Sequence, residues 1–180
     1  MVRRRRGDLG TPSHRGGVGV CKPPGDRFTM VPMVSLPTGY TLRVGPPSVG
    51  SYVYLREASG MSPKTYQQAL AGIDGAWAAV HVVHAPTGET VAMGRVLGDG
   101  GWYFHIIDMA VLPEHQRQGL GDTILTWLLD RIRQDAPPDA FVSLMADSPG
   151  RSLYERHGFK DRSPRNVGMS RLLERQVDDD

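Results

Sequence analysis

Cysteine is nearly absent from this sequence of 180 residues, and long apolar runs are absent altogether. The single cysteine, Cys21, excludes an intramolecular disulfide, so we expect a reducing compartment and a cytoplasmic protein. No apolar stretch approaches the ~20 residues of a membrane-spanning helix, and the N-terminal residues lack the apolar core of a secretory signal. We therefore expect no membrane segment and no membrane partner. The composition, 39% hydrophobic and 22% charged, is typical of a globular domain.

The charge is divided unevenly along the chain. Residues 1–28 carry a net charge of +5, largely from Arg3 to Arg6, whereas the remainder carries −3. The small net negative charge of the remainder argues against nucleic-acid binding by the folded part of the chain. We expect residues 1–35 to be a disordered basic leader, because they are rich in Gly, Pro and Arg and show no apolar period. An alternative stays open, in which the Arg cluster is a targeting or nucleic-acid-binding tail.

Residues 36–172 alternate between strand-like and helix-like patterns, which predicts one domain of mixed α/β class followed by an acidic tail over 173–180. The expected helices include one with Ser62 as N-cap and Pro63 at its first position. The expected strands are 40–45, 76–85, 89–98, 101–111 and 140–146, with 166–173 as a last strand or extended segment. The expected helices are 48–59, 62–73, 121–136 and 150–158.

The junction between strand 101–111 and helix 121–136 contains the segment Gln116-Arg117-Gln118-Gly119-Leu120-Gly121. The start of a helix has unpaired backbone N–H groups and a positive dipole end, and glycines let an anion approach the backbone. The spacing is not the Gly-x-Gly-x-x-Gly of dinucleotide folds, because position 124 is Ile, and no P-loop Gly-Lys-Ser/Thr follows. The residues alone indicate either an anion-binding helix start or glycines that pack a helix on a strand.

Two motifs carry a family resemblance. Gln116 to Gly121 matches the pattern Gln/Arg-x-x-Gly-x-Gly/Ala, and the segment 153–159, Leu-Tyr-Glu-Arg-His-Gly-Phe, matches Leu-Tyr-x-x-x-Gly-Phe. With both motifs, the chain resembles the GNAT-type N-acetyltransferase superfamily over about residues 38–170. The resemblance implies a GNAT-like fold with a mostly antiparallel mixed sheet of six to seven strands and about four flanking helices. It also implies a splayed strand pair that holds acyl-CoA.

The resemblance implies acetyl-CoA as the acyl donor and suggests which residues would bind it. The backbone of Met109, Ala110 and Val111 would contact pantetheine, with one N–H polarising the thioester carbonyl. Asp122 or Thr123 would also cap the helix. Asp147 stands where many members have Asn, and Gly150 where many have Ala, so the chain departs from the family at this pantetheine contact. The pyrophosphate would lie on the backbone N–H groups of residues 117–122, and the cofactor-binding residues expected in this segment are Gln116, Arg117, Gln118, Gly119, Leu120, Gly121, Asp122 and Thr123.

Two residues are candidates for proton transfer. The acceptor amine must lose a proton, and His105 stands where some family members have a catalytic Glu or His. Tyr154 matches the family tyrosine that donates a proton to the leaving CoA thiolate. The alternatives are a core histidine at 105 and a core aromatic at 154. Asp108 should face away from His105 in the same strand, and we interpret it as a structural carboxylate.

The acceptor is the least determined part of the sequence-based prediction. In the family, the segment corresponding to residues 56–66 lines the acceptor pocket, and we expect the acceptor to be a small primary amine. We expect direct transfer rather than a covalent acetyl-cysteine intermediate, since Cys21 lies far from both motifs. Protein amines are the second choice. A catalytically silent acyl-CoA-binding module is a third reading, and the resemblance allows a homodimer. We expect no metal, because His81 and His84 face opposite sides of a strand.

Overall fold

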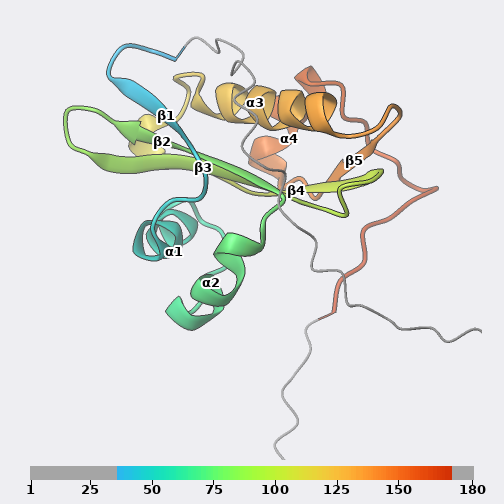
Figure 1. Ribbon diagram of the computed structural model, residues 1–180, viewed down its shortest axis with the longest axis horizontal. Helices are drawn as coiled ribbons and strands as arrows, with labels where there is room; N and C mark the ends of the chain where they lie inside the picture. The colour runs from blue at the N-terminus through green and yellow to red at the C-terminus, as the bar shows by residue number, and fades with distance from the viewer. Residues whose placement is uncertain (1–35, 172–180) are drawn as a thin grey trace, which may run out of the picture.

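A single five-stranded sheet organises the computed structural model, which describes residues 36–171 (Figure 1). The strands follow one another in chain order across the sheet. The first four pair antiparallel, and β5 pairs parallel to β4. The strands are β1 (Tyr40–Val44), β2 (Ala78–His84), β3 (Glu89–Gly98), β4 (Tyr103–Val111) and β5 (Phe141–Leu144).

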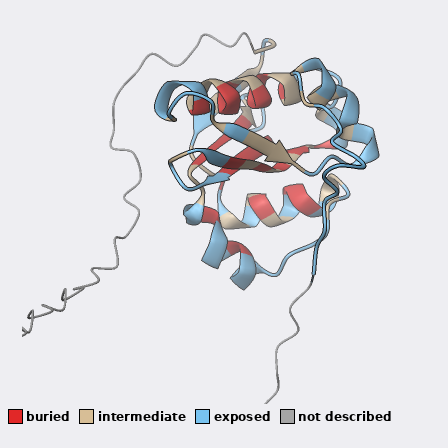
Figure 2. Ribbon diagram, turned by 90° about the vertical axis from the view of Figure 1, so that its right-hand side faces the viewer, coloured by how far each residue is buried: buried red, intermediate tan, exposed pale blue. Residues whose placement is uncertain are grey.

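Helices cover both faces of this sheet. α1 (Val49–Ala58) and α2 (Tyr66–Gly72) lie on one face, and α3 (Leu120–Asp135) covers the other, with α4 (Arg151–Arg156) beside the start of α3 (Figure 1). The buried residues lie in the sheet and on the helix sides that face it (Figure 2). Short 3-10 turns connect these elements at η1 (Ile73–Gly75), η2 (Pro113–His115) and η3 (Ser148–Gly150). The mixed α/β prediction is therefore confirmed.

The predicted start of the second helix is wrong. Thr65 is its N-cap, and its hydroxyl accepts from the Gln68 amide while the Gln68 side chain accepts from the Thr65 amide. This reciprocal capping box satisfies two amide groups at once, which Ser62 and Pro63 do not offer. Ser62 has a different use, since its carbonyl accepts hydrogen bonds from the Arg56 guanidinium.

The sheet has fewer strands than the six to seven expected. Residues 166–171 form no strand. Their apolar side chains are exposed to solvent, Val167 to 66% and Met169 to 93%. A strand without a buried face has little to stabilise its register. The predictions for the leader 1–35, for Cys21 and for the tail 173–180 lie outside the described residues.

β4 and β5 stay paired over only four residues. Their register runs from Tyr103 opposite Phe141 to Ile106 opposite Leu144, where β5 ends. β4 continues to Val111, so among the described residues its last stretch has no strand on the β5 side. The expected splayed strand pair is thus present, and its opening faces the start of α3.

Gly94 marks a close approach between the sheet and α3. A Cβ atom at this position would lie 2.6 Å from Ile124 Cγ2, 2.7 Å from Met109 Sδ and 3.1 Å from Leu128 Cδ1. All three neighbours belong to the core or pack against it, so they have little room to move. Gly94 therefore determines how closely α3 packs on β3.

We predict that Gly94→Ala destabilises the fold by about 1–3 kcal/mol, because an added methyl overpacks this contact. Gly50→Ala is the matched control, since Gly50 is exposed on α1 with nothing within 4 Å of an added Cβ. Alanine there should stabilise the helix by up to about 1 kcal/mol. Urea unfolding measures both changes, and equal stabilities for the two variants would contradict the close packing of α3.

Candidate active site

A cleft of about 640 Å³ opens where β4 parts from β5. Its walls come from β4, from the loop that enters α3, from the η3–α4 segment and from the α1–α2 connection. The lining residues are 59–61, 106–111, 115–117, 119–122, Met145, Asp147, 149–150, 152–154 and Arg156. The cleft thus brings together both motifs, although they are separated by more than thirty residues of chain. Of the predicted site residues, Gln118, Thr123 and His105 do not line it.

The loop before α3 leaves the helix start open. Gly119 is the N-cap, with φ 81°, and no side chain caps the helix. The Gln116 side chain donates to the Val111 carbonyl at 3.1 Å, and Arg117 has φ 59°, a conformation unusual for a residue with a side chain. An uncapped helix start lined by glycine is a site where backbone N–H groups can bind an anion.

The expected capping by Asp122 or Thr123 is wrong. The Asp122 carboxylate accepts from Arg156 at 2.9 Å and lies 3.1 Å from His157 Nε2, so α4 holds it. Thr123 is buried beneath the helix start. Both side chains lie beyond the first residues of α3, which begins at Leu120 rather than Gly121.

The two motif glycines have different structural roles. At Gly119 an added Cβ would meet nothing within 4 Å, but the positive φ disfavours any L side chain. At Gly121 an added Cβ would lie 3.2 Å from Leu153 Cδ2 on α4. Gly119 therefore serves the backbone conformation of the loop, and Gly121 serves packing between α3 and α4.

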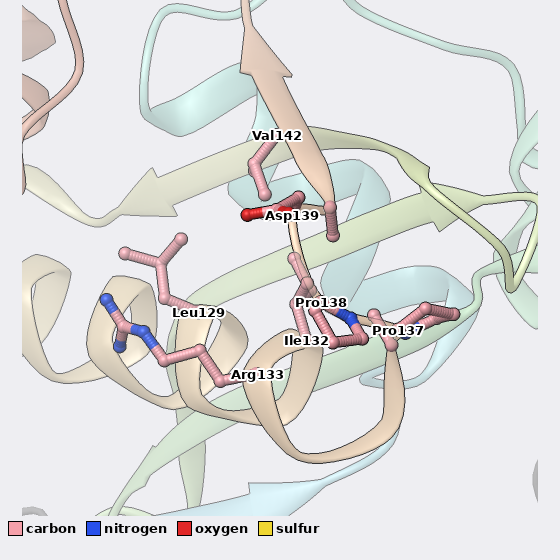
Figure 3. Close-up of a pocket in the computed structure, with 9 residues that line it drawn as sticks. Leu129, Ile132, Arg133, Pro137, Pro138, Asp139 and Val142 are labelled. Atoms are coloured by element: carbon pink, nitrogen blue, oxygen red, sulfur yellow. The ribbon is translucent and has the colours of Figure 1, made fainter.

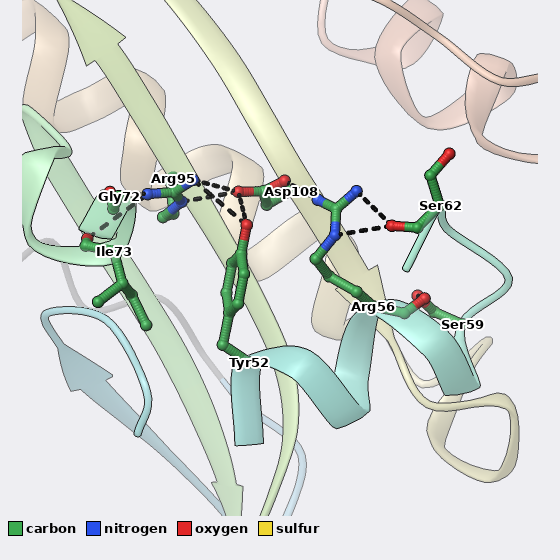
Figure 4. A network of polar contacts seen from close by, with 8 residues as sticks. All are labelled: Tyr52, Arg56, Ser59, Ser62, Gly72, Ile73, Arg95 and Asp108. Atoms are coloured by element: carbon green, nitrogen blue, oxygen red, sulfur yellow. Dashed lines mark hydrogen bonds and ion pairs between the residues drawn. The ribbon is translucent and has the colours of Figure 1, made fainter. Parts of the chain in front are cut away.

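Asp108 lies at a bulge in β4 and at the centre of a buried ionic network (Figure 4). Its φ is 55°, and the β3–β4 register shifts between Met93 and Arg95. Arg56 from α1 pairs with one carboxylate oxygen, while Arg95 from β3 donates to the other at 2.7 Å. Tyr52 donates to the same oxygen as Arg95 at 2.9 Å. We call these four residues, Tyr52, Arg56, Arg95 and Asp108, the Asp108 network.

The Asp108 network is fully hydrogen-bonded. The remaining guanidinium N–H groups reach backbone carbonyls, those of Arg56 at Ser62 and those of Arg95 at Gly72. No buried side-chain polar atom of residues 36–171 lacks a partner. These contacts agree with the interpretation of Asp108 as a structural carboxylate, although Asp108 also lines the cleft. Sequence reasoning missed both arginines, and the only signal was a carboxylate interrupting an apolar run.

Tyr154 lies half-buried on α4 with its ring against the η3 turn. A Cβ at Gly150 would lie 3.3 Å from the Tyr154 ring, and Phe159 packs edge-on at 6.2 Å between centroids. Burial raises the pKa of the Tyr154 hydroxyl, and the nearby charge of Asp147 raises it further. The hydroxyl is therefore protonated at neutral pH. Asp147 is exposed at the cleft and makes no ion pair within the described part of the chain.

His105 lies away from the cleft lining. Its Nδ1 lies 2.8 Å from the Ser143 hydroxyl of β5, and burial lowers its pKa. The burial of β4 alternates, with Phe104, Ile106 and Asp108 buried and His105 only partly so, which places His105 and Asp108 on opposite faces as expected. An intervening water would have to carry a proton between this imidazole and the cleft.

A second cavity, of about 390 Å³, lies at the other end of α3 (Figure 3). Leu129, Ile132 and Arg133 of α3 face Val142 of β5 across it, with Pro137 and Pro138 in the connecting loop. It contains no residue of either motif. Nowhere in residues 36–171 do three or more His, Cys, Asp or Glu side chains gather as a metal site. Of the helices described, none is long and apolar enough to span a bilayer.

Comparisons with known proteins agree with this geometry. The family model described as "Acetyltransferase (GNAT) domain" matches residues 76–161. A structure from methicillin-resistant Staphylococcus aureus, of unknown function and described as a probable acetyltransferase, is 34% identical, with a TM-score of 0.71 over 74% of this chain and 99% of that one. No curated protein matches the sequence.

Two more distant structures share the fold. Glucosamine-6-phosphate N-acetyltransferase from Arabidopsis thaliana is 16% identical, with a TM-score of 0.55 over 74% of this chain and 99% of that one. The ribosomal-protein-S18-alanine N-acetyltransferase from Escherichia coli is 17% identical, with a TM-score of 0.56 over 69% and 79%. With the Staphylococcus aureus relative matched over nearly its whole length and both motifs meeting in one cleft, the chain belongs to the GNAT acetyltransferase family.

Proposed function

We propose that this protein transfers the acetyl group of acetyl-CoA to a primary amine of a small molecule, by direct attack within a ternary complex. The observation that carries the proposal is that one cleft contains an uncapped helix start, the end of β4, which among residues 36–171 has no strand on its β5 side, and the protonated hydroxyl of Tyr154. These are the groups needed to bind a pyrophosphate, to align an extended thioester arm and to protonate a leaving thiolate.

The residues present fit acetyl-CoA. The loop from Gln116 to Gly119, with the first N–H groups of α3, would bind the pyrophosphate, and Arg117 adds a positive charge at the cleft. The backbone of Met109 to Val111 would hydrogen-bond the pantetheine arm, because β5 ends before reaching it. The bound donor supplies an activated thioester. Leu120 to Thr123 would complete the site, with Asp122 and Thr123 contributing through their backbone rather than as caps.

A protonated amine must first release one proton to solvent, and the attack of the neutral amine then requires two further proton movements. The amine nitrogen bonds to the thioester carbon while the carbon–sulfur bond breaks, and Tyr154 donates its proton to the departing sulfur. The amine loses a proton of its own, and His105 receives it through a water in this proposal. Burial keeps the imidazole neutral at neutral pH, so it is available to accept a proton.

The acceptor would enter beside residues 59–61, which line the cleft as the family resemblance implies. Asp147 supports an amine acceptor, since an exposed carboxylate without an ion-pair partner in residues 36–171 attracts a protonated amine to the cleft. The structural neighbours include enzymes named for an amino-sugar phosphate and for an alanine of a ribosomal protein. A protein amine is therefore the second candidate acceptor.

Binding and turnover test the proposal together. Calorimetry with acetyl-CoA measures binding, and release of free thiol measures turnover on arylalkylamines, polyamines, amino sugars, a lysine peptide and a peptide with a free N-terminal alanine. Turnover on a small amine supports the proposal, and turnover confined to the peptides favours the second candidate. Binding without any turnover favours a silent acyl-CoA-binding module.

We predict that Tyr154→Phe lowers kcat by about 100-fold or more, because a positioned general acid typically contributes 10²–10⁴-fold. The dissociation constant for acetyl-CoA should change less than threefold, since the ring remains in place. Tyr54→Phe is the control, because Tyr54 is 52% exposed on α1 and does not line the cleft. Unchanged turnover in Tyr154→Phe would exclude the proposed acid.

We predict that His105→Gln removes the acid limb of the pH–rate profile. In the wild type this limb should fall at a pH below 6.5, because burial lowers the pKa of His105 from that ordinary value. The dissociation constant for acetyl-CoA should remain nearly unchanged. A pH–rate profile identical to that of the wild type would exclude His105 as the base.

The same variant has an expected signature in stability. Because the pKa of His105 is lowered in the folded state, the unfolded state binds more protons as the pH falls below about 6.5. This group therefore contributes stability above that pH, and the contribution is lost on acidification. Thermal unfolding between pH 7.5 and 5 should show a smaller loss for His105→Gln than for the wild type, whether or not His105 acts in catalysis.

A further inference from the structure

We propose that Tyr40, on β1, is a positioning residue for the loop 113–118 and thereby sets the affinity for acetyl-CoA. The inference rests on the proposed function, because it assigns a role in binding at the same cleft. It extends that function to a strand far from both motifs in the sequence.

The Tyr40 hydroxyl contacts two side chains of this loop. It lies 2.7 Å from His115 Nδ1 and donates to Gln118 Oε1 at 2.9 Å, across 75 and 78 residues of sequence. The aromatic rings pack at the same place. The Tyr40 ring meets the His115 ring edge-on, with 5.7 Å between centroids, and lies tilted against the His84 ring at 5.3 Å. His84 is the register partner of Tyr40 on β2 and lies 5.0 Å from the His115 ring. The sheet therefore contacts the loop through one compact aromatic cluster.

Other hydrogen bonds of this loop are local. His115 N–H donates to the Leu112 carbonyl, Gln116 N–H to the Pro113 carbonyl, and the Gln118 side chain lies 3.5 Å from the Glu114 carbonyl. The Gln116 side chain reaches back only to Val111 at the end of β4. Among the hydrogen bonds of residues 36–171, those of Tyr40 alone join loop 113–118 to a strand other than β4.

The Tyr40 contacts lie on either side of the strained residue of the loop. Arg117, with φ 59°, lies between His115 and Gln118. A left-handed conformation costs a non-glycine residue roughly 1–2 kcal/mol and persists where the surroundings fix it. Tyr40 provides two fixed points around Arg117, next to the uncapped N–H groups of α3. Without the hydroxyl, the loop can relax, and the backbone donors lose the arrangement that suits a pyrophosphate.

The hydrogen-bond pattern also determines a tautomer. A tyrosine hydroxyl has one proton, so if it donates to Gln118 it must accept from His115. His115 Nδ1 then carries the proton, and Nε2 is left as the acceptor of the neutral ring. His115 lines the cleft, so this arrangement determines which polar atom of the ring remains for other partners.

Tyr40→Phe tests the inference, because it removes the hydroxyl and keeps the ring. The expected result is acetyl-CoA binding weakened roughly 5- to 20-fold, the size that one or two lost hydrogen bonds produce. The KM for acetyl-CoA should rise by a similar factor, while kcat at saturating acetyl-CoA and the KM for the amine stay within twofold. Tyr54→Phe is again the matched control and should bind as the wild type does.

Two further measurements separate positioning from general loss of structure. Nitrogen-15 NMR of the histidines should show His115 as the Nδ1–H tautomer in the wild type and a changed signature in Tyr40→Phe. In a double-mutant cycle, Tyr40→Phe combined with Gln118→Leu should bind acetyl-CoA no more than about twofold weaker than the weaker single variant. Fully multiplicative effects would overturn the proposed contact.

These measurements distinguish failure of the role proposed for Tyr40 from failure of the proposed acetyltransferase function. If the wild type binds acetyl-CoA and Tyr40→Phe binds it equally well, the role of Tyr40 is overturned alone. If the wild type binds no acetyl-CoA, the proposed function is overturned and the role of Tyr40 with it. A drop in kcat without a change in acetyl-CoA affinity would also overturn the assignment of Tyr40 to binding.

Discussion

The carboxylate of Asp108, held between Arg56 and Arg95, is the constraint on which the cleft depends. It joins α1, β3 and β4 at the bulge, where the left-handed backbone of Asp108 would otherwise be costly. Buried ions stabilise a fold only when each is paired and hydrogen-bonded, and here the remaining guanidinium groups reach backbone carbonyls. The bulge is thereby held within residues 106–111, the stretch of β4 that borders the cleft.

The end of β5 and the start of α3 determine which backbone groups border the cleft. β5 ends at Leu144 while β4 continues, and α3 begins at Leu120 without a side-chain cap. Within residues 36–171, β4 has no strand on its β5 side beyond Ile106 and the first N–H groups of α3 have no side-chain cap, and such backbone groups are costly unless water or a ligand satisfies them. A cleft lined by backbone donors suits a long polar ligand better than a compact apolar one. Family membership and local geometry therefore lead to the same class of ligand.

The sequence predicted best what is local and least what depends on register. Gln116 to Gly121 and Leu153 to Phe159 are contiguous motifs, and most of their residues meet in the cleft. The partners of Asp108 and of His115 come from distant elements, and nothing in the sequence indicates which arginine or tyrosine will face them. The sequence predicts too early a start for the second helix because Ser62-Pro63 resembles a helix start, whereas the capping box at Thr65 satisfies more amide groups. The strand count was too high because residues 166–171 have no buried face.

Binding and chemistry are supported by different elements of the fold. The Tyr40 hydroxyl joins loop 113–118 to β1 through His115, whereas Tyr154 lies on α4 against η3. Asp108 and its arginines hold the strand between these two regions. The Tyr40 contacts and the Tyr154 contacts are separate, but the two regions meet where Asp122 of α3 accepts from Arg156 of α4 and where Gly121 packs on Leu153. In the proposed function the acceptor enters beside residues 59–61, which line the cleft but belong to neither motif, so acceptor specificity could vary while the proposed donor site remains intact.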